Sequence, residues 1–397
     1  MPPKRPGGLK KSAGSNTPSA SSEALAKKVK ESKDAERVED GEDTMQIALA
    51  ETGNEIEEAA EMFKMALAKL DEGDDGVEEG AALLRGVVHE SDRINRAHHS
   101  NNNSNTDHST SIQPLPPQFH LTYGAALFRL GLLLAHAESD GDEPDNAEPI
   151  AYFDAAIDRF EIGIDAIEND EFAAWKLHEA VARAQIEKAN LIFYSDETVP
   201  AKKIDEIVTQ AVSHIEKALV ALGDSDLDES ISVISILVRH AQIRQLRDIK
   251  SSEKWINASR LELNKLLKAD PNHIGALVAL GQTYMTAAND LLERAEEHGE
   301  EVDLKAVEKL IDEALKHAEK GQKESDKKGK ADVKLQLLLG EIFVNKANIL
   351  DEAEKEEDAD KFYKKAVACF KQVQALDASA LPEAFDSFLQ DWESEME

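Results

Sequence analysis

The chain of 397 residues carries 79 Asp and Glu side chains against 46 Lys and Arg, a formal net charge of −33. This excess excludes a simple electrostatic binder of nucleic acid or of an anionic membrane surface, because both kinds of binding draw on Lys and Arg. The single cysteine excludes an intramolecular disulfide framework, so the chain needs no oxidising compartment. No apolar run of about 18 residues and no secretory signal is present, so we expect a soluble intracellular protein without membrane association.

The N-terminal segment differs in charge from the rest of the chain. Residues 1–37 hold nine basic and four acidic side chains, a net charge of +5, so residues 38–397 carry −38. Residues 1–22 are rich in Pro, Gly and Ser, and we expect residues 1–44 to form a disordered tail. Lys4, Arg5, Lys10 and Lys11 form two short basic pairs typical of a nuclear-import signal. They predict a nuclear location, with shuttling to the cytoplasm left open; a merely solubilising basic end is the alternative.

Residues 45–397 predict a helical domain with two interruptions. Residues 98–117 form a low-complexity polar run closed by three prolines, which we expect to be a disordered insertion. Its His98, His99 and His108 lack a rigid element and a thiol or carboxylate partner set, so no metal site is expected there. Residues 139–149 are expected to form a shorter acidic loop.

The apolar residues outside these interruptions recur at steps of three and four, as in Phe153, Ile157 and Phe160. This spacing is typical of helices that bury one face. No run alternates with the period of two that a strand requires. The sequence therefore predicts an all-α protein of about 12 to 14 helices.

A repeat accompanies this helical pattern. One helix carries Leu-x-x-Leu-Gly-x-x-aromatic, seen most clearly in Leu277, Leu280, Gly281 and Tyr284, and the next carries Ala-x3-Phe. The frame recurs at 127–134 and 339–343, with weaker copies at 175–218 and 263–271. About five such units predict a tetratricopeptide-like right-handed solenoid, and an irregular helical bundle is the alternative.

No motif of a chemical site appears in the chain. It lacks a Gly-rich phosphate loop, HExxH, CxxC and GxSxG, and its acidic clusters at 71–75 and 351–360 lack the spacing of a calcium loop. Cys369 lies on an apolar helical stripe, which favours a small buried hydrophobe over a nucleophile. We expect no catalytic residue, no cofactor and no metal, and therefore no enzyme.

The segment LLRGVVHESDRINR at 83–96 has more polar residues than a simple amphipathic helix needs. At helical spacing four of them share one face, and a glutamate lies beside them. One interpretation is a buried polar network that clamps this helix to its neighbours, with Asp92 paired to an arginine. The other is a partner-binding patch. The candidate residues are His89, Glu90, Asp92, Arg93 and Arg96.

Four segments resemble one known family: KRPGGLKK (4–11), GVVHESDRINR (86–96), FHLTYGAALFRLG (119–131) and LPEAFDSFLQDW (381–392). This is the fungal enhancer of translation termination family, which includes the negative regulator of a nuclear prolyl-hydroxylase-like oxygenase. The resemblance implies a non-catalytic nuclear adaptor or regulator, required for correct translation termination and for hypoxic gene expression. It implies protein partners, either a nuclear 2-oxoglutarate-dependent oxygenase or the translation-termination machinery, and no direct contact with nucleic acid.

The acidic surface leaves a second functional hypothesis open. An acidic holdase or assembly chaperone would bind basic clients such as histones or ribosomal proteins. Its binding would be lost between low and physiological salt, because salt screens exposed charges, whereas an adaptor would keep one selected partner.

Overall fold

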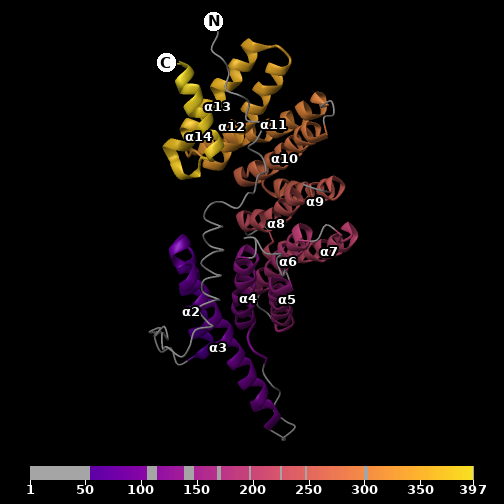
Figure 1. Ribbon diagram of the computed structural model, residues 1–397, viewed down its shortest axis with the longest axis vertical. Coiled ribbons are helices and arrows are strands. Elements are labelled where there is room, and N and C mark those ends of the chain that lie inside the picture. Colours follow the sequence, from indigo (N-terminus) through magenta and orange to yellow (C-terminus); the bar gives the residue numbers. More distant parts are fainter. Residues whose placement is uncertain are drawn as a thin grey trace. The chain divides into compact units, whose positions relative to one another are not determined.

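The computed structural model describes residues 54–104, 114–137, 147–167, 171–195, 198–223, 226–245, 248–298 and 303–396. Within these residues it contains thirteen α-helices, two short 3-10 helices and no strand (Figure 1), which confirms the predicted all-α class. The chain divides into two compact units after Gly223. The predicted tail at 1–44, with Lys4, Arg5, Lys10 and Lys11, lies outside the described residues.

The first unit, residues 54–223, is built from three helical hairpins. α2 pairs with α3, α4 with α5, and α6 with α7. Asn54 begins α2 as its N-cap, because its side chain accepts a hydrogen bond from the Ile56 amide at 3.1 Å. The helices are α2 (Glu55–Leu70), α3 (Val77–Ser104), α4 (Pro117–Ala137), α5 (Ala147–Asp165), α6 (Glu171–Ser195) and α7 (Ala201–Leu222), with the 3-10 turn η1 (Gly73–Gly76) before α3.

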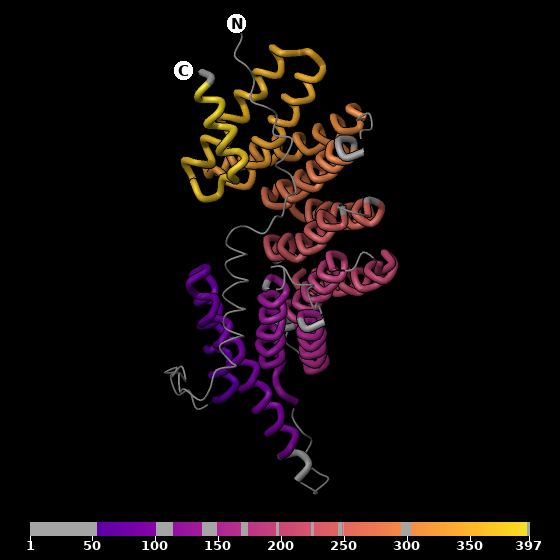
Figure 2. The backbone as a smooth tube through the Cα atoms, in the orientation of Figure 1, coloured from indigo at the N-terminus to yellow at the C-terminus, as the bar shows by residue number. Residues whose placement is uncertain are grey.

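The second unit, residues 226–396, repeats this plan. α8 pairs with α9, α10 with α11, and α12 with α13, while α14 packs on α13. Figure 2 shows these helices following one another as antiparallel pairs. Their bounds are α8 (Leu227–Gln245), α9 (Ile249–Ala269), α10 (Ile274–His298), α11 (Leu304–Lys328), α12 (Val333–Glu352), α13 (Glu356–Leu376) and α14 (Glu383–Met396), with the 3-10 turn η2 (Ala378–Ala380) before α14.

Contacts between neighbouring hairpins follow one rule within each unit. The first helices of successive hairpins touch, as α4 and α6 do, and the second helix of a hairpin touches the first helix of the next, as α5 and α6 do. Lys188 of α6 donates to Asp154 of α5, and Lys346 of α12 donates to Asp312 of α11, each pair being 34 residues apart. Successive helical hairpins stacked by the same contacts are the arrangement of a helical-repeat protein, so the predicted repeat class is confirmed.

Two glycines of the repeat frame, Gly131 and Gly340, lie where an aromatic ring crosses from the paired helix. A Cβ atom at Gly131 would stand 2.9 Å from the Phe153 ring, and one at Gly340 would stand 2.3 Å from the Phe370 ring. Only glycine has room for this approach. In the α12/α13 hairpin the frame glycine, Gly340, and the frame phenylalanine, Phe370, are therefore two halves of one contact.

Three boundaries differ from the sequence prediction. Helix α3 continues to Ser104, so the prediction starts the interruption at 98–117 too early. Pro117, the last residue of the predicted interruption, is the first residue of α4. Residues 105–113 and 138–146 lie outside the described residues, and α5 begins at Ala147, inside the loop expected at 139–149. The repeat frame does not predict the α2/α3 hairpin, because the glycines at its close helix contact, Gly80 and Gly86, lie on the second helix and not on the first.

Candidate functional site

The five candidate polar residues of segment 83–96 lie along α3 with unequal exposure, and we call them the α3 patch: His89, Glu90, Asp92, Arg93 and Arg96. His89, Arg93 and Arg96 are exposed, whereas Glu90 and Asp92 are partly buried. The opposite side of the helix packs into the core through Leu83, Leu84, Val87 and Ile94. The helical face predicted from the sequence is therefore present, but its residues differ in exposure and in the contacts that they make.

Asp92 ties α3 to the next hairpin. The Tyr123 hydroxyl of α4 donates to Asp92 Oδ1 at 2.5 Å, and the Arg159 guanidinium of α5 lies 4.9 Å from the centroid of the Tyr123 ring. Burial, together with the bond to Asp92, raises the pKa of Tyr123 to about 12, so the phenol stays protonated and remains a donor. Tyr123, held by Asp92 on one side and by Arg159 on the other, thereby joins three helices.

Arg93 ties α3 to the helix before it. Its Nη2 lies 2.5 Å from Glu90 Oε1 on the same helix and 2.8 Å from Glu55 Oε1 of α2. Hydrogen bonds from Arg93 lower the pKa of the Glu90 carboxyl. The expected pairing of Asp92 with an arginine side chain is not what is seen, since Arg96 Nε donates to the backbone oxygen of Asp92 at 3.2 Å.

These contacts divide the α3 patch into two parts. Asp92 and Arg93 hold α3 against α4 and α2, which is the work of a structural clamp. His89 and Arg96 present an imidazole and a guanidinium to solvent, and in the part of the chain that the structure describes they are the two exposed residues of the patch without a side-chain contact to another helix.

We expect Tyr123→Phe to lower the free energy of unfolding of residues 54–223 by about 1–3 kcal/mol, because it leaves a partly buried carboxylate without its donor. Urea unfolding followed by circular dichroism measures this change. Tyr152→Phe is the matched control, since Tyr152 is half-buried and its hydroxyl has no hydrogen bond among the described residues. Equal unfolding midpoints for the two variants would show that the Asp92 contact adds no stability.

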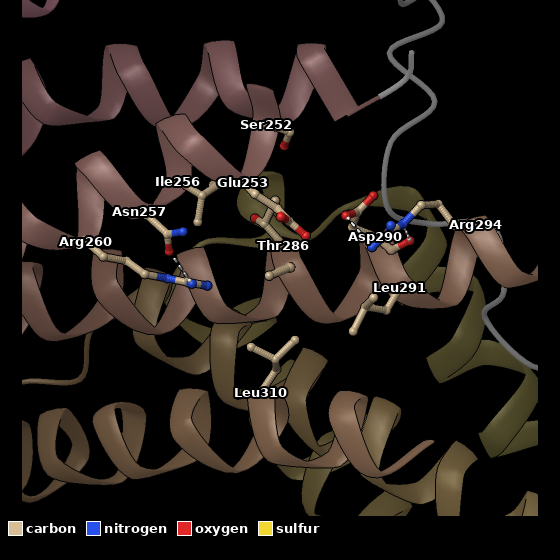
Figure 3. Close-up of a pocket in the computed structure, with 11 residues that line it drawn as sticks. Ser252, Glu253, Ile256, Asn257, Arg260, Thr286, Asp290, Leu291, Arg294 and Leu310 are labelled. Carbon is tan, nitrogen blue, oxygen red and sulfur yellow. Dashed lines mark hydrogen bonds and ion pairs between the residues drawn. The ribbon is translucent and has the colours of Figure 1, made fainter. Parts of the chain in front are cut away.

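A second candidate site is a cleft of about 210 Å³ in the second unit. It opens between α9 and α10, with one side chain from α11 (Figure 3). Asp290 pairs with Arg294 along α10, with Oδ2 and Nη2 3.2 Å apart. The lining residues are Ser252, Glu253, Ile256, Asn257, Arg260, Thr286, Ala287, Asp290, Leu291, Arg294 and Leu310.

Arg260 lines this cleft and is held by hydrogen bonds to α10. Its Nη2 donates to the Thr283 carbonyl oxygen at 2.7 Å and its Nε to Thr283 Oγ1 at 3.1 Å. Its guanidinium lies 4.1 Å from the centroid of the Tyr284 ring, and that ring stacks on His317 of α11. Burial lowers the pKa of Arg260. Sequence analysis missed this residue, because the only signal for it was Tyr284, which the repeat frame had assigned to helix packing.

The expectations about chemical sites can be set against the described residues. Cys369 is buried, and burial raises the pKa of its thiol to about 11, as suits a core residue. Within the described ranges no group of three or more His, Cys, Asp or Glu is placed to hold a metal ion. No helix in this part of the chain is long and apolar enough to cross a membrane.

A family model described as nuclear pore complex subunit Nro1 matches residues 3–230. The chain belongs to the Nro1 family. Membership confirms the family resemblance read from the sequence, and the nuclear description confirms the expected location. The matched range contains three of the segments that carried the resemblance, at 4–11, 86–96 and 119–131, whereas the segment at 381–392 lies beyond it.

Relatives of the Nro1 family member described here carry regulatory names. The negative regulator of ofd1 from Schizosaccharomyces pombe is 33% identical over 189 residues, which are 47% of this chain and 42% of that protein. The chain thus matches less than half the length of that relative. Enhancer of translation termination 1 from Saccharomyces cerevisiae is 22% identical over 351 residues, 78% of this chain and 82% of that protein.

Two solved structures of S. pombe Nro1 are also similar. One, of the nuclear import adaptor Nro1, has a TM-score of 0.45 and 23% identity, and covers 85% of this chain and 98% of that one. The other, of Nro1 as the hypoxic regulator of sterol synthesis and a nuclear import adaptor, has a TM-score of 0.47 and 21% identity, with coverage of 94% and 97%.

Proposed function

We propose that the protein is a non-catalytic nuclear adaptor that binds a protein partner through its helical repeats and enters the nucleus by its basic N-terminal segment. The observation that carries this proposal is the family match over residues 3–230, which includes both the basic segment and the first helical unit. Stacked helical hairpins offer an extended surface suited to holding another protein.

The names of the relatives support one class of partner. One is a negative regulator of ofd1 and another an enhancer of translation termination, while S. pombe Nro1 is described as a hypoxic regulator and nuclear import adaptor. We therefore propose a nuclear 2-oxoglutarate-dependent oxygenase or a component of translation termination as the partner, and regulation of hypoxic gene expression as the outcome. The acidic body of the protein would steer a partner with basic or mixed-charge segments.

One experiment with three variants tests the adaptor role in cells. Changing Lys4, Arg5, Lys10 and Lys11 to Ala should shift the protein and its co-purified partner from the nucleus to the cytoplasm, leaving their association intact. Changing Lys27, Lys28, Lys30 and Lys33 to Ala removes the same charge from the same tail and should leave both proteins nuclear. His89→Ala combined with Arg96→Ala should leave the protein nuclear but without its partner. Fluorescence microscopy and quantitative co-purification give the readouts.

Two results would contradict the proposal. If all variants accumulate in the nucleus equally, Lys4, Arg5, Lys10 and Lys11 are not the import signal. If no discrete partner survives at physiological salt, and only assorted basic proteins are recovered at low salt, the protein acts as a holdase and not as an adaptor.

A further inference from the structure

We infer that the cleft between α9 and α10 binds a carboxylate group, which pairs with Arg260. Four observations carry this inference: the hydrogen bonds that Arg260 leaves unmade, the absence of an acidic partner for it, the size of the cleft, and the rigid placement of the guanidinium. The site is distinct from the α3 patch and does not depend on the adaptor role.

The guanidinium of Arg260 has donors to spare. Arginine carries five N–H groups, and three of them are used here, by Thr283 Oγ1, the Thr283 carbonyl and Asn257 Oδ1, the last at 3.3 Å from Nη1. One N–H therefore remains on each terminal nitrogen. A carboxylate that approaches the end of the guanidinium meets both, in the two-bond arrangement that arginine favours.

The charge of Arg260 is not neutralised within the described residues. All three of its acceptors are neutral, and no acidic oxygen forms an ion pair with it. Asp290, at the other end of the cleft, is paired with Arg294 (Figure 3). Glu253 lies seven residues earlier on α9, about 10 Å along the helix axis at 1.5 Å per residue. A partly buried cation without a counter-charge favours an anion from outside.

The size and walls of the cleft fit a small acid or a single acidic side chain. Its volume of about 210 Å³ exceeds the cavity of about 150 Å³ that takes up one benzene molecule, and is below the range of about 300–1,000 Å³ for drug-sized ligands. Ile256, Leu291 and Leu310 supply apolar surface on which the methylene groups of a glutamate or of a dicarboxylic acid would rest.

Arg260 is already held in one position. Hydrogen bonds to α9 and α10 fix its plane, and the Tyr284 ring supports it 4.1 Å away, itself stacked on His317. A carboxylate binding here would not need to order a long, flexible arginine side chain, a cost that otherwise weakens binding.

Two sources can provide the carboxylate, and the probes separate them. The full chain is titrated with succinate, with the peptide acetyl-Gly-Glu-Gly-amide and with its Gln counterpart, while NMR follows the labelled methyl groups of Ile256, Leu291 and Leu310. Shifts caused by the Glu peptide alone identify a partner's acidic side chain as the ligand, and shifts caused by succinate alone identify a free acid. No saturable shift with either acid, or equal shifts with the Gln peptide, would overturn the proposal.

Four variants complete the test. Arg260→Gln should weaken binding of the acidic probe at least tenfold, and Arg260→Lys should weaken it less, because lysine keeps the charge but loses the two-bond geometry. Ala287→Phe fills the cleft, leaves Arg260 in place and should abolish binding. Lys268→Gln, an exposed charge on the same helix, is the matched control and should bind as the unmodified protein does. Undiminished binding by both Arg260→Gln and Ala287→Phe would overturn the proposal.

Discussion

Gly340→Ala is expected to destabilise the second unit of the unmodified protein by about 1–3 kcal/mol, the usual cost of overpacking a core, and to stabilise it once Phe370 is replaced by Ala. The added methyl group would stand 2.3 Å from Cε1 of the Phe370 ring. That ring is fully buried and stacks on Phe385 with centroids 4.5 Å apart. Its neighbours therefore prevent it from shifting away from the added methyl group.

Phe370→Ala by itself should cost about 3–5 kcal/mol, because it empties the centre of the α12–α14 cluster. In that background the Gly340 methyl enters the vacated space, and alanine gains about 1 kcal/mol over glycine in a helix interior. The effect of Gly340→Ala therefore changes sign between the two backgrounds. This reversal is the signature of a direct steric contact.

Hydrogen exchange of the α12–α14 amides, read by mass spectrometry, measures these changes locally in the full chain. Gly321→Ala on α11 is the matched control, since the nearest atom to its added methyl would be a flexible leucine methyl 3.3 Å away; we expect it to stay within about 1 kcal/mol of the unmodified protein. If Gly340→Ala lowers protection equally in both backgrounds, the ring contact is not its cause.

The same contact explains how far sequence analysis could go. In the α12/α13 hairpin the frame identifies a real packing contact, because its glycine, Gly340, and its phenylalanine, Phe370, meet directly. In the other hairpins the frame identifies the apolar faces on which paired helices pack. Each of the five predicted units falls on a hairpin of the structure. The end of α3 was misplaced because HHSNNNS has no apolar face, and periodicity indicates a helix only where one side is buried.

The side-chain contacts of the candidate sites could not be predicted from the sequence, for a physical reason. Helical spacing groups Asp92 with Arg93 and Arg96, yet Asp92 binds Tyr123, 31 residues away on another helix. Arg260 likewise binds Thr283, 23 residues further along. A repeat frame predicts which helices are neighbours, but the pairing of side chains across them depends on register and crossing angle, which one sequence without a structure does not supply.

Acidification from pH 7 to pH 5 is expected to lower the free energy of unfolding through two buried histidines, one in each unit. Burial, with a contribution from Arg244, lowers the pKa of His240 to about 3. Burial, with contributions from Arg159 and His98, lowers the pKa of His120 to about 4. Both side chains are almost wholly inaccessible to solvent, so the folded protein excludes the charged form that the unfolded chain takes up.

The direction of the effect follows from proton binding. Above pH 6.5, the ordinary pKa of histidine, both states are neutral and these residues add no pH dependence. Below it the unfolded chain binds protons that the folded protein does not, so stability falls until the pH reaches the folded-state pKa. At pH 5 this amounts to about 2 kcal/mol for each histidine.

Many carboxylates also titrate toward low pH, so the histidine contribution has to be isolated by difference. Urea unfolding of the full chain at pH 7 and pH 5 gives the loss of stability on acidification, with each unit followed separately by hydrogen exchange. His240→Gln should reduce that loss by about 2 kcal/mol in the second unit and His120→Gln by a similar amount in the first, whatever either substitution does to stability at pH 7. His136→Gln, at an exposed position, should leave the loss unchanged. If all three variants lose as much stability as the unmodified protein, the buried histidines do not cause its sensitivity to acid.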